Sequence, residues 1–127
     1  MTDITPKRVV PVTVDVSTAA DGSVDITCSP NPANIIEGSS NVLLTFTLAT
    51  AGYRFRNTKT IELDVPVDDF PYNSWTISDT IAGLYDRNKV ADLLKYTVHV
   101  VDIKTGQEYS VDPEIKNGGG GFGDGDC

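Results

Sequence analysis

The chain has 127 residues, a length that suits one domain with a buried core. Its 10 Lys and Arg against 18 Asp and Glu give a formal net charge of -8 at pH 7, with no block of like charge. Nucleic acids and anionic membranes are bound by clustered cations, so this composition argues against both as partners. Two cysteines and one histidine are too few for the common zinc sites, and we expect no metal and no cofactor.

Hydropathy and cysteine usage suggest where the protein works. The opening residues contain no apolar run of the length that a signal peptide needs, and no stretch has the length of a membrane span. We therefore expect a cytoplasmic protein with reduced thiols. Cys28 falls on the apolar face of a predicted strand and is expected in the core, whereas Cys127 is terminal and expected to be exposed.

Apolar and polar residues alternate along the first half of the chain, the period of a half-buried strand. Residues 9–16 place valines on one face, and Pro11 marks this strand as an edge or bulged one. A turn at 20–22 and alternation over 24–28 predict that the first two strands form a hairpin. Further strands are predicted at 41–50, 53–55 and 60–65, with a short one beginning at 35–36.

The second half contains an aromatic-rich segment at 68–75, which we expect to be a packed loop capping the core, with a ligand pocket as the alternative. One strand is predicted from Trp75 to Tyr85 with Gly83 as a bulge, and a helical turn is plausible only at 86–93. Seven or eight short alternating strands predict an all-β fold, an antiparallel two-sheet sandwich of the immunoglobulin-like kind. The domain is expected to span residues 1–117, followed by a flexible glycine-rich tail, 118–127.

The last predicted hairpin carries a polar face. Lys95, Thr97 and His99 alternate with apolar residues on its first strand, as Ser110 and Asp112 do on its second. Matching the apolar faces across a short bulged loop predicts Asp112 opposite His99, and Ser110 opposite the valine at 101. In a regular ladder that register leaves the Lys95 amine too far from Asp112 for contact. Such a face is most often only the solvated side of a sheet.

The bond between Asp112 and Pro113 follows this strand directly. An aspartate carboxyl can attack its own backbone carbonyl through a five-membered ring, and a bond to proline is easier to distort than an ordinary amide. This is the most breakable kind of link in a backbone, although most Asp-Pro pairs do nothing except start a turn.

Several short motifs resemble the bacterial DP-EP family, formerly listed as a domain of unknown function. They are 69–72, 74–75, 77–79, 95–98, 112–115 and Asn117, within a similarity that covers roughly residues 9–117. The chain departs from the family after Asn117, where the second dipeptide of the family's name is replaced by a glycine-rich run. The resemblance implies a β-sandwich that cuts itself at the Asp-Pro bond, here Asp112-Pro113, and can join the new aspartyl end to a lysine. Lys95 is the implied acceptor, and Lys104 and Lys116 are its rivals.

Two mechanisms are consistent with such a cut. In the first, the Asp112 carboxylate attacks its own carbonyl carbon, the Pro113 nitrogen leaves with a proton, and water or the lysine opens the cyclic anhydride. In the second, a separate carboxylate activates water, as in an aspartic peptidase. Candidates for that acid are Asp79, Asp102 and Glu114. His99, expected across from Asp112, would donate the proton or orient the water.

Two rival functions remain at this stage. The chain can be a binding module that pairs with another protein through an edge strand or the aromatic segment at 70–75, in which case it stays intact. It can also be an assembly protein, if the acceptor lysine belongs to a neighbouring molecule and cleavage links the chains covalently.

Overall fold

The computed structural model describes residues 7–120, and within them the chain forms strands and no helix. The strands are β1 (Arg8–Thr18), β2 (Val24–Ser29), β3 (Ala33–Ile35), β4 (Val42–Leu48), β5 (Tyr53–Phe55), β6 (Ile61–Leu63), β7 (Trp75–Ser78), β8 (Ile81–Asp86), β9 (Asp92–Asp102), β10 (Glu108–Val111) and β11 (Glu114–Asn117). The helical turn considered at 86–93 is wrong: these residues are the end of β8, a connection and the start of β9. No helix of the described part could cross a membrane.

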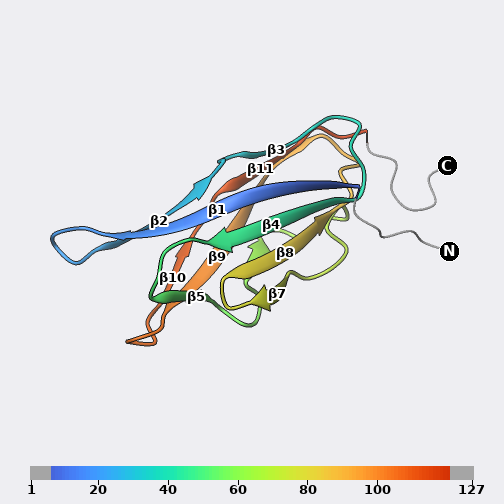
Figure 1. The fold of residues 1–127 in the computed structure, drawn as a ribbon. Helices are drawn as coiled ribbons and strands as arrows, with labels where there is room; N and C mark the ends of the chain where they lie inside the picture. The colour runs from blue at the N-terminus through green and yellow to red at the C-terminus, as the bar shows by residue number, and fades with distance from the viewer. Residues whose placement is uncertain (1–6, 121–127) are drawn as a thin grey trace.

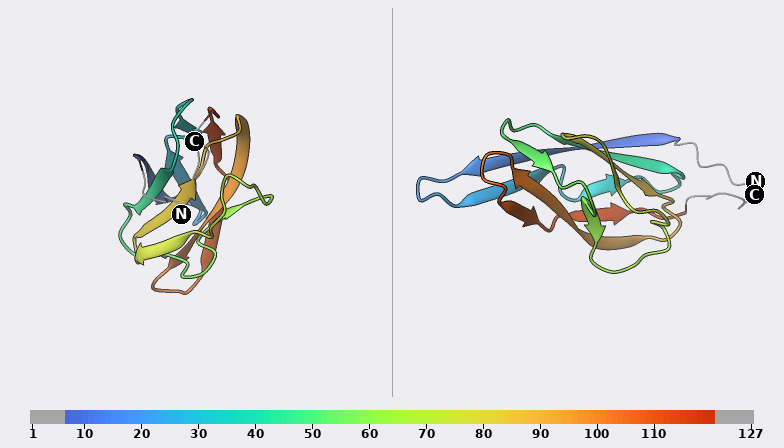
Figure 2. Two further views of the ribbon diagram at one scale, coloured as in Figure 1. Left: turned by 90° about the vertical axis from the view of Figure 1, so that its right-hand side faces the viewer. Right: turned by 90° about the horizontal axis from the view of Figure 1, so that it is seen from below.

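The strands form two sheets that pack face to face (Figures 1 and 2). One sheet has the order β2-β1-β4-β8-β7, and the other has β10-β9-β11-β3 with β5 and β6 also paired to β9. This confirms the all-β two-sheet sandwich. The sheets are mixed rather than antiparallel throughout, because β1 pairs with β4 and β3 with β11 in parallel. The chain leaves the first sheet after β2, so β4 returns beside β1 in the same direction.

The predicted alternation builds the core. In β1 the valines 12, 14 and 16 are buried while their neighbours are exposed, and in β9 the alternate residues Leu94, Tyr96, Val98 and Val100 are buried. The two layers meet where the rings of Phe46 and Tyr96 approach edge to face, 5.6 Å between centroids. Cys28 is buried as expected, and Cys127 lies outside the described residues. At Pro11 strand β1 has a partner only on the β4 side, because pairing with β2 begins at Thr13, which fits an edge proline.

The segment expected to be one strand with a bulge at Gly83 is instead the hairpin of β7 and β8. Gly83 is regularly paired, and the irregularity lies in β7 between Thr76 and Ser78. A Cβ atom at Gly83 would lie 2.8 Å from the Trp75 ring, so glycine is needed here for the close approach of the indole rather than for a bulge.

The boundary of the tail also differs from the expectation. Gly118 donates its N–H to the Ile35 carbonyl at 2.8 Å, and the N–H of the buried Gly119 bonds to Asn88 Oδ1 at 2.9 Å. A Cβ at Gly118 would lie 2.4 Å from the Glu37 nitrogen. Residues 118–120 therefore belong to the folded domain, and the rest of the expected tail, 121–127, lies outside the described residues.

Candidate functional site

The Asp112-Pro113 bond lies between β10 and β11, which are consecutive parts of one extended segment along β9. Val111 pairs with Val98 and Glu114 pairs with Lys95, so continuing either ladder places Asp112 opposite Thr97 and Pro113 opposite Tyr96. The Pro113 carbonyl accepts the Tyr96 N–H at 3.0 Å. Pro113 is buried whereas Asp112 is exposed, so the bond joins a solvated side chain to a fixed ring.

This register corrects the prediction that Asp112 faces His99. In the structure His99 pairs with Ser110, and the valine at 101 pairs with Glu108. The reason lies in the turn: Asp102 Oδ1 accepts the N–H groups of Lys104 and Thr105 at 2.8 and 3.3 Å, and the Asp102 N–H bonds to the Gln107 carbonyl at 2.9 Å. This side-chain cap moves the centre of the turn one residue toward β9, so each residue of β10 pairs two residues further back on β9 than expected.

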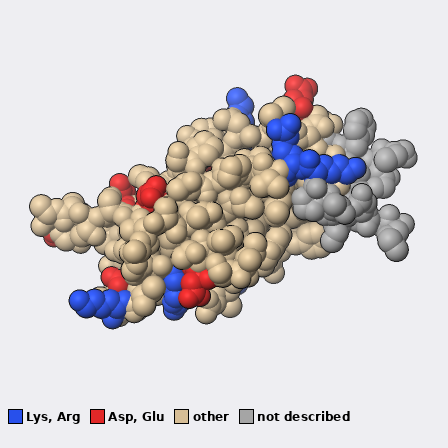
Figure 3. All heavy atoms as spheres, viewed as in Figure 1, with Lys and Arg blue, Asp and Glu red and all other residues tan. Residues whose placement is uncertain are grey.

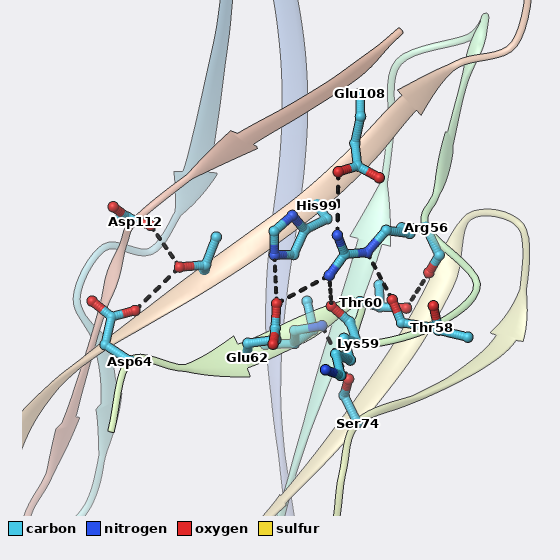
Figure 4. Close-up of polar contacts among 12 residues, drawn as sticks. Arg56, Thr58, Lys59, Thr60, Glu62, Asp64, Ser74, His99, Glu108 and Asp112 are labelled. Carbon is cyan, nitrogen blue, oxygen red and sulfur yellow. Dashed lines mark hydrogen bonds and ion pairs between the residues drawn. The ribbon is translucent and has the colours of Figure 1, made fainter. Parts of the chain in front are cut away.

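Thr97 connects Asp112 to a second carboxyl group. Its hydroxyl lies 2.7 Å from Asp112 Oδ1 and 3.1 Å from Asp64 Oδ1, and Figure 4 shows the two acids with these contacts as dashed lines. A hydroxyl has one hydrogen to donate. That hydrogen can point to one carboxyl group or be shared between the two. The Thr97 hydroxyl therefore links Asp112 to Asp64.

Lys95 lies much closer to Asp112 than the predicted register allowed. It is paired with Glu114 on one side, and on the other side its carbonyl accepts the Asp64 N–H at 3.1 Å. Because Asp112 is opposite Thr97, Lys95 is the diagonal neighbour of Asp112 on the same face. Diagonal neighbours are roughly 7–8 Å apart, within reach of a long side chain. Between the acids Asp64 and Glu114, the exposed amine forms no ion pair with any residue of 7–120.

His99 has a different partner from the one expected. Its Nε2 is 2.8 Å from Glu62 Oε1, and the same oxygen accepts from Arg56 at 3.0 Å (Figure 4). Arg56 also bonds to Glu108 at 3.2 Å, so it joins the connection before β6 to the edge strand β10. His99 is therefore part of a surface ion-pair network beside the Asp-Pro bond. No hydrogen bond connects it to Asp112 in the described structure.

The acids proposed to activate water have other places. Asp79 lies in the turn between β7 and β8 of the other sheet, exposed, and its backbone carbonyl accepts the Phe55 N–H at 2.7 Å. Asp102 caps the turn after β9. Only Glu114 shares the face of Asp112, and its N–H bonds to Asn31 Oδ1 at 2.9 Å. The structure therefore does not bring Asp79 to the bond.

Asp64 was not predicted from the sequence as a residue of this site. The signal was present, because Glu62 and Asp64 alternate with apolar residues in the predicted strand at 60–65. That alternation shows a polar face but not which strand it borders. The pairing of β6 with β9, with Glu62 opposite Thr97, supplies the missing step.

The two outer faces of the sandwich differ in charge. The face formed by β1, β4 and β8 shows few charged side chains (Figure 3). The outer face around β9 combines acids with basic groups, among them the acids Glu62, Asp64, Glu108, Asp112 and Glu114 and the basic residues Arg54, Arg56, Lys95, His99 and Lys116. Titratable chemistry on the sheets is therefore concentrated on the face that carries the Asp-Pro bond.

The aromatic segment packs as expected and also borders a groove. Phe70 packs against the core, and the rings of Tyr72 and Tyr85 lie 5.6 Å apart. Between this segment and β6 is a groove of about 830 Å³, lined among others by Leu63, Phe70 and Arg87. Asp112 and Pro113 do not line it, so this groove and the Asp-Pro bond are separate features.

No protein-family model matches the chain, and no curated protein matches it. Residues 7–120 contain no group of three or more His, Cys, Asp or Glu side chains placed to hold a metal ion.

Proposed function

We propose that the chain is a self-cleaving β-sandwich, of the immunoglobulin-like kind, that cuts its own Asp112-Pro113 bond and can transfer the Asp112 acyl group to Lys95. The observation that carries the proposal is the shared Thr97 hydroxyl, which sets a second carboxyl, Asp64, beside the acid of the labile bond. The similarity of the motifs to the DP-EP family supports the same chemistry.

The first step is attack by an Asp112 carboxylate oxygen on its own carbonyl carbon, which forms a five-membered cyclic anhydride and breaks the bond to the Pro113 nitrogen. That nitrogen must gain a proton as it leaves. We assign this proton to Asp64, in the proton-donor role that the sequence prediction gave to His99. The fixed ring of Pro113, held by the Tyr96 N–H, keeps the leaving group in place during the attack.

The second step opens the anhydride. Water gives a free Asp112 end, whereas the neutral Lys95 amine gives an amide and no water is consumed. The amine loses a proton as the new C–N bond forms, and the anhydride oxygen leaves as the Asp112 carboxylate. The exposed position of Lys95 also permits attack on another molecule, which would link two chains.

Mass spectrometry of the intact purified protein over days tests the proposal. Hydrolysis gives fragments 1–112 and 113–127 that together gain one water, and transfer to Lys95 gives a first fragment lighter by one water. Asp112→Ala should abolish both, and Lys95→Arg only the lighter species, with Lys104→Arg as the matched control. A linked dimer would identify transfer between molecules. An unbroken chain in every sample refutes the proposal.

A matched pair of variants tests the assignment of the proton donor. Asp64→Asn removes the group that can donate a proton through Thr97, whereas Asp79→Asn makes the same chemical change in the other sheet. We expect cleavage to slow on the order of 10²-fold in the first variant and to stay unchanged in the second. Equal rates in the two variants would remove Asp64 from the mechanism.

A further inference from the structure

A group of buried polar side chains lies at the other end of β11, away from the Asp-Pro bond. Asp69, Asp86, Asn88 and Asn117 have exposed fractions of 4%, 0%, 0% and 2%. They come from the aromatic segment, the end of β8, the connection after it and the end of β11. Four buried polar side chains in one place need an account of every donor and acceptor, since an unmatched buried polar atom costs about 1–3 kcal/mol.

Most of these atoms have partners. Asp69 accepts the backbone N–H groups of Lys89 and Val90, each at 3.1 Å. Asp86 Oδ1 accepts the Asn88 N–H at 2.8 Å and the Asn117 side-chain N–H at 3.2 Å. The Asn117 amide also lies 3.4 Å from Asp69 Oδ2. One strand-end asparagine therefore donates toward two buried carboxyl groups.

Two oxygens of the group have no hydrogen-bond partner, Asp86 Oδ2 and Asn117 Oδ1. They belong to the two side chains already joined by the bond from Asn117 Nδ2 to Asp86 Oδ1. A single proton on Asp86 Oδ2 would satisfy both, because the acid would donate to Asn117 Oδ1 and close a cyclic acid-amide pair. An ionised Asp86 would instead leave both oxygens buried without a hydrogen-bond donor.

A metal ion fits this pair less well than a proton. Calcium takes about six to eight oxygen ligands, and the two Asp69 carboxylate oxygens and Asp86 Oδ1 are already occupied by N–H donors. Two oxygens remain, which suits one hydrogen between them.

The electrostatic surroundings favour the neutral acid. Burial raises the pKa of Asp86 to about 7, and the charge of Asp69 acts in the same direction. Three other titratable groups are close by in the chain: Arg87, whose side chain lines the groove beside Phe70, Lys89, and Tyr85, whose hydroxyl donates to Asn41. On the neighbouring strand β9, Asp92 is paired with Asn117 and is exposed. Asp69 is the one charged side chain that contributes to the shift of Asp86.

We propose that Asp86 is a neutral acid in the folded chain and that the hydrogen-bonded pair of Asp86 and Asn117, called the lock below, holds β11 in the sandwich. Because the pair needs the proton of Asp86, the lock weakens as the pH rises. Asn117 is the last residue of β11, and the glycines 118–120 that follow it are hydrogen-bonded to the rest of the domain. The lock acts four residues after Pro113. If the chain cuts itself as proposed above, the same pair holds the fragment 113–127 in place, and its release becomes pH-dependent.

The lock is tested first in Asp112→Ala, a chain that cannot cut itself, so the result does not depend on the proposed function. Carbon-13 NMR of the Asp86 carboxyl carbon over pH 3 to 9 should show a titration midpoint within about a unit of 7. Asp86→Asn keeps the shape and can form the equivalent amide-amide pair, so β11 amides should stay protected from hydrogen exchange at pH 8. With Asp at position 86, the protection factors of the β11 amides should fall at least tenfold between pH 5 and 8, after correction for the intrinsic change in exchange rate. Asp25→Asn, on the exposed face of β2, is the charge-matched control.

An Asp86 midpoint near 4, or protection at pH 8 that is the same with Asp and Asn at position 86, overturns the lock. For the cut wild-type chain, dissociation of 113–127 should be at least tenfold faster at pH 8 than at pH 5, and Asp86→Asn should remove the difference. If the wild type stays intact while Asp86 titrates near 7, the self-cleavage proposal fails and the lock stands.

Discussion

The pH dependence of stability in Asp86→Asn is a direct measure of the buried acid. The pKa of Asp86 rises from an ordinary value of 3.8 to about 7 on folding, mainly through burial. A shift of about three units corresponds to roughly 4 kcal/mol, since each unit is worth about 1.4 kcal/mol. Because the folded state holds the proton more tightly, this contribution is fully present below pH 3.8 and is lost as the pH rises through about 7.

The assay is urea unfolding at a series of pH values between 4 and 8, in the Asp112→Ala background, for Asp and Asn at position 86. The Asn side chain cannot ionise, so the stability of that variant relative to the parent should increase by roughly 4 kcal/mol across the range. With a urea dependence of about 2 kcal/mol per molar, the gap between the two midpoints should change by roughly 2 M. A change of roughly 4 kcal/mol is a large part of the 5–15 kcal/mol that stabilises a typical domain.

Other acids also titrate in this range, and a net charge of -8 makes the whole chain sensitive to pH. The comparison between variants removes those terms, and Asp25→Asn shows the effect of one surface charge alone. A gap that stays constant within about 1 kcal/mol from pH 4 to 8 would refute the reasoning. Asp86 would then be ionised throughout, with its orphan oxygen matched in some other way.

Three further changes follow from the structure. Tyr96→Phe removes a buried hydroxyl that has no N or O partner and meets only the Cys28 thiol, a weak hydrogen-bonding group, so the free energy of unfolding should stay equal or rise by about 1 kcal/mol, measured by thermal unfolding; a loss above about 2 kcal/mol would contradict this. Gly118→Ala places a Cβ 2.4 Å from the Glu37 nitrogen and should cost about 1–3 kcal/mol in the same measurement. Thr97→Val keeps the branched shape but removes the hydroxyl beside Asp112, so cleavage followed by intact mass should slow at least tenfold, while Thr97→Ser should retain it.

The parts of the fold that could be predicted are those set by local alternation. The valines of β1 and the buried residues of β9 face the core as the period of two requires, and the turn at 20–22 joins β1 and β2 as expected. The β7–β8 turn was missed because Ser78-Asp79-Thr80 contains neither glycine nor proline. The hydrogen bond from the Thr80 N–H to Ser78 Oγ, 3.3 Å, stabilises that turn instead.

The neighbours of β9 could not be predicted, because strand pairing over long distances is not written in a local pattern. Asp64 reaches the site through the pairing of β6 with β9, across more than thirty residues of chain. The lock at Asp86 depends in the same way on β11 lying beside the end of β8. In both places the polar residues were visible in the sequence, but their partners belong to elements that only the tertiary fold brings together.

The register of the last hairpin shows why the chemistry of this site is more sensitive to detail than its fold. A shift of two residues along β9 leaves every apolar side chain on the core face, so hydrophobic matching cannot distinguish the two registers. The cap made by Asp102 does distinguish them, because it closes the turn earlier. Under the expected register a histidine would face Asp112 and the lysine would be out of reach. Under the observed one Thr97 faces Asp112 and Lys95 is its diagonal neighbour, so a single turn-capping carboxylate decides which side chains lie beside the Asp-Pro bond.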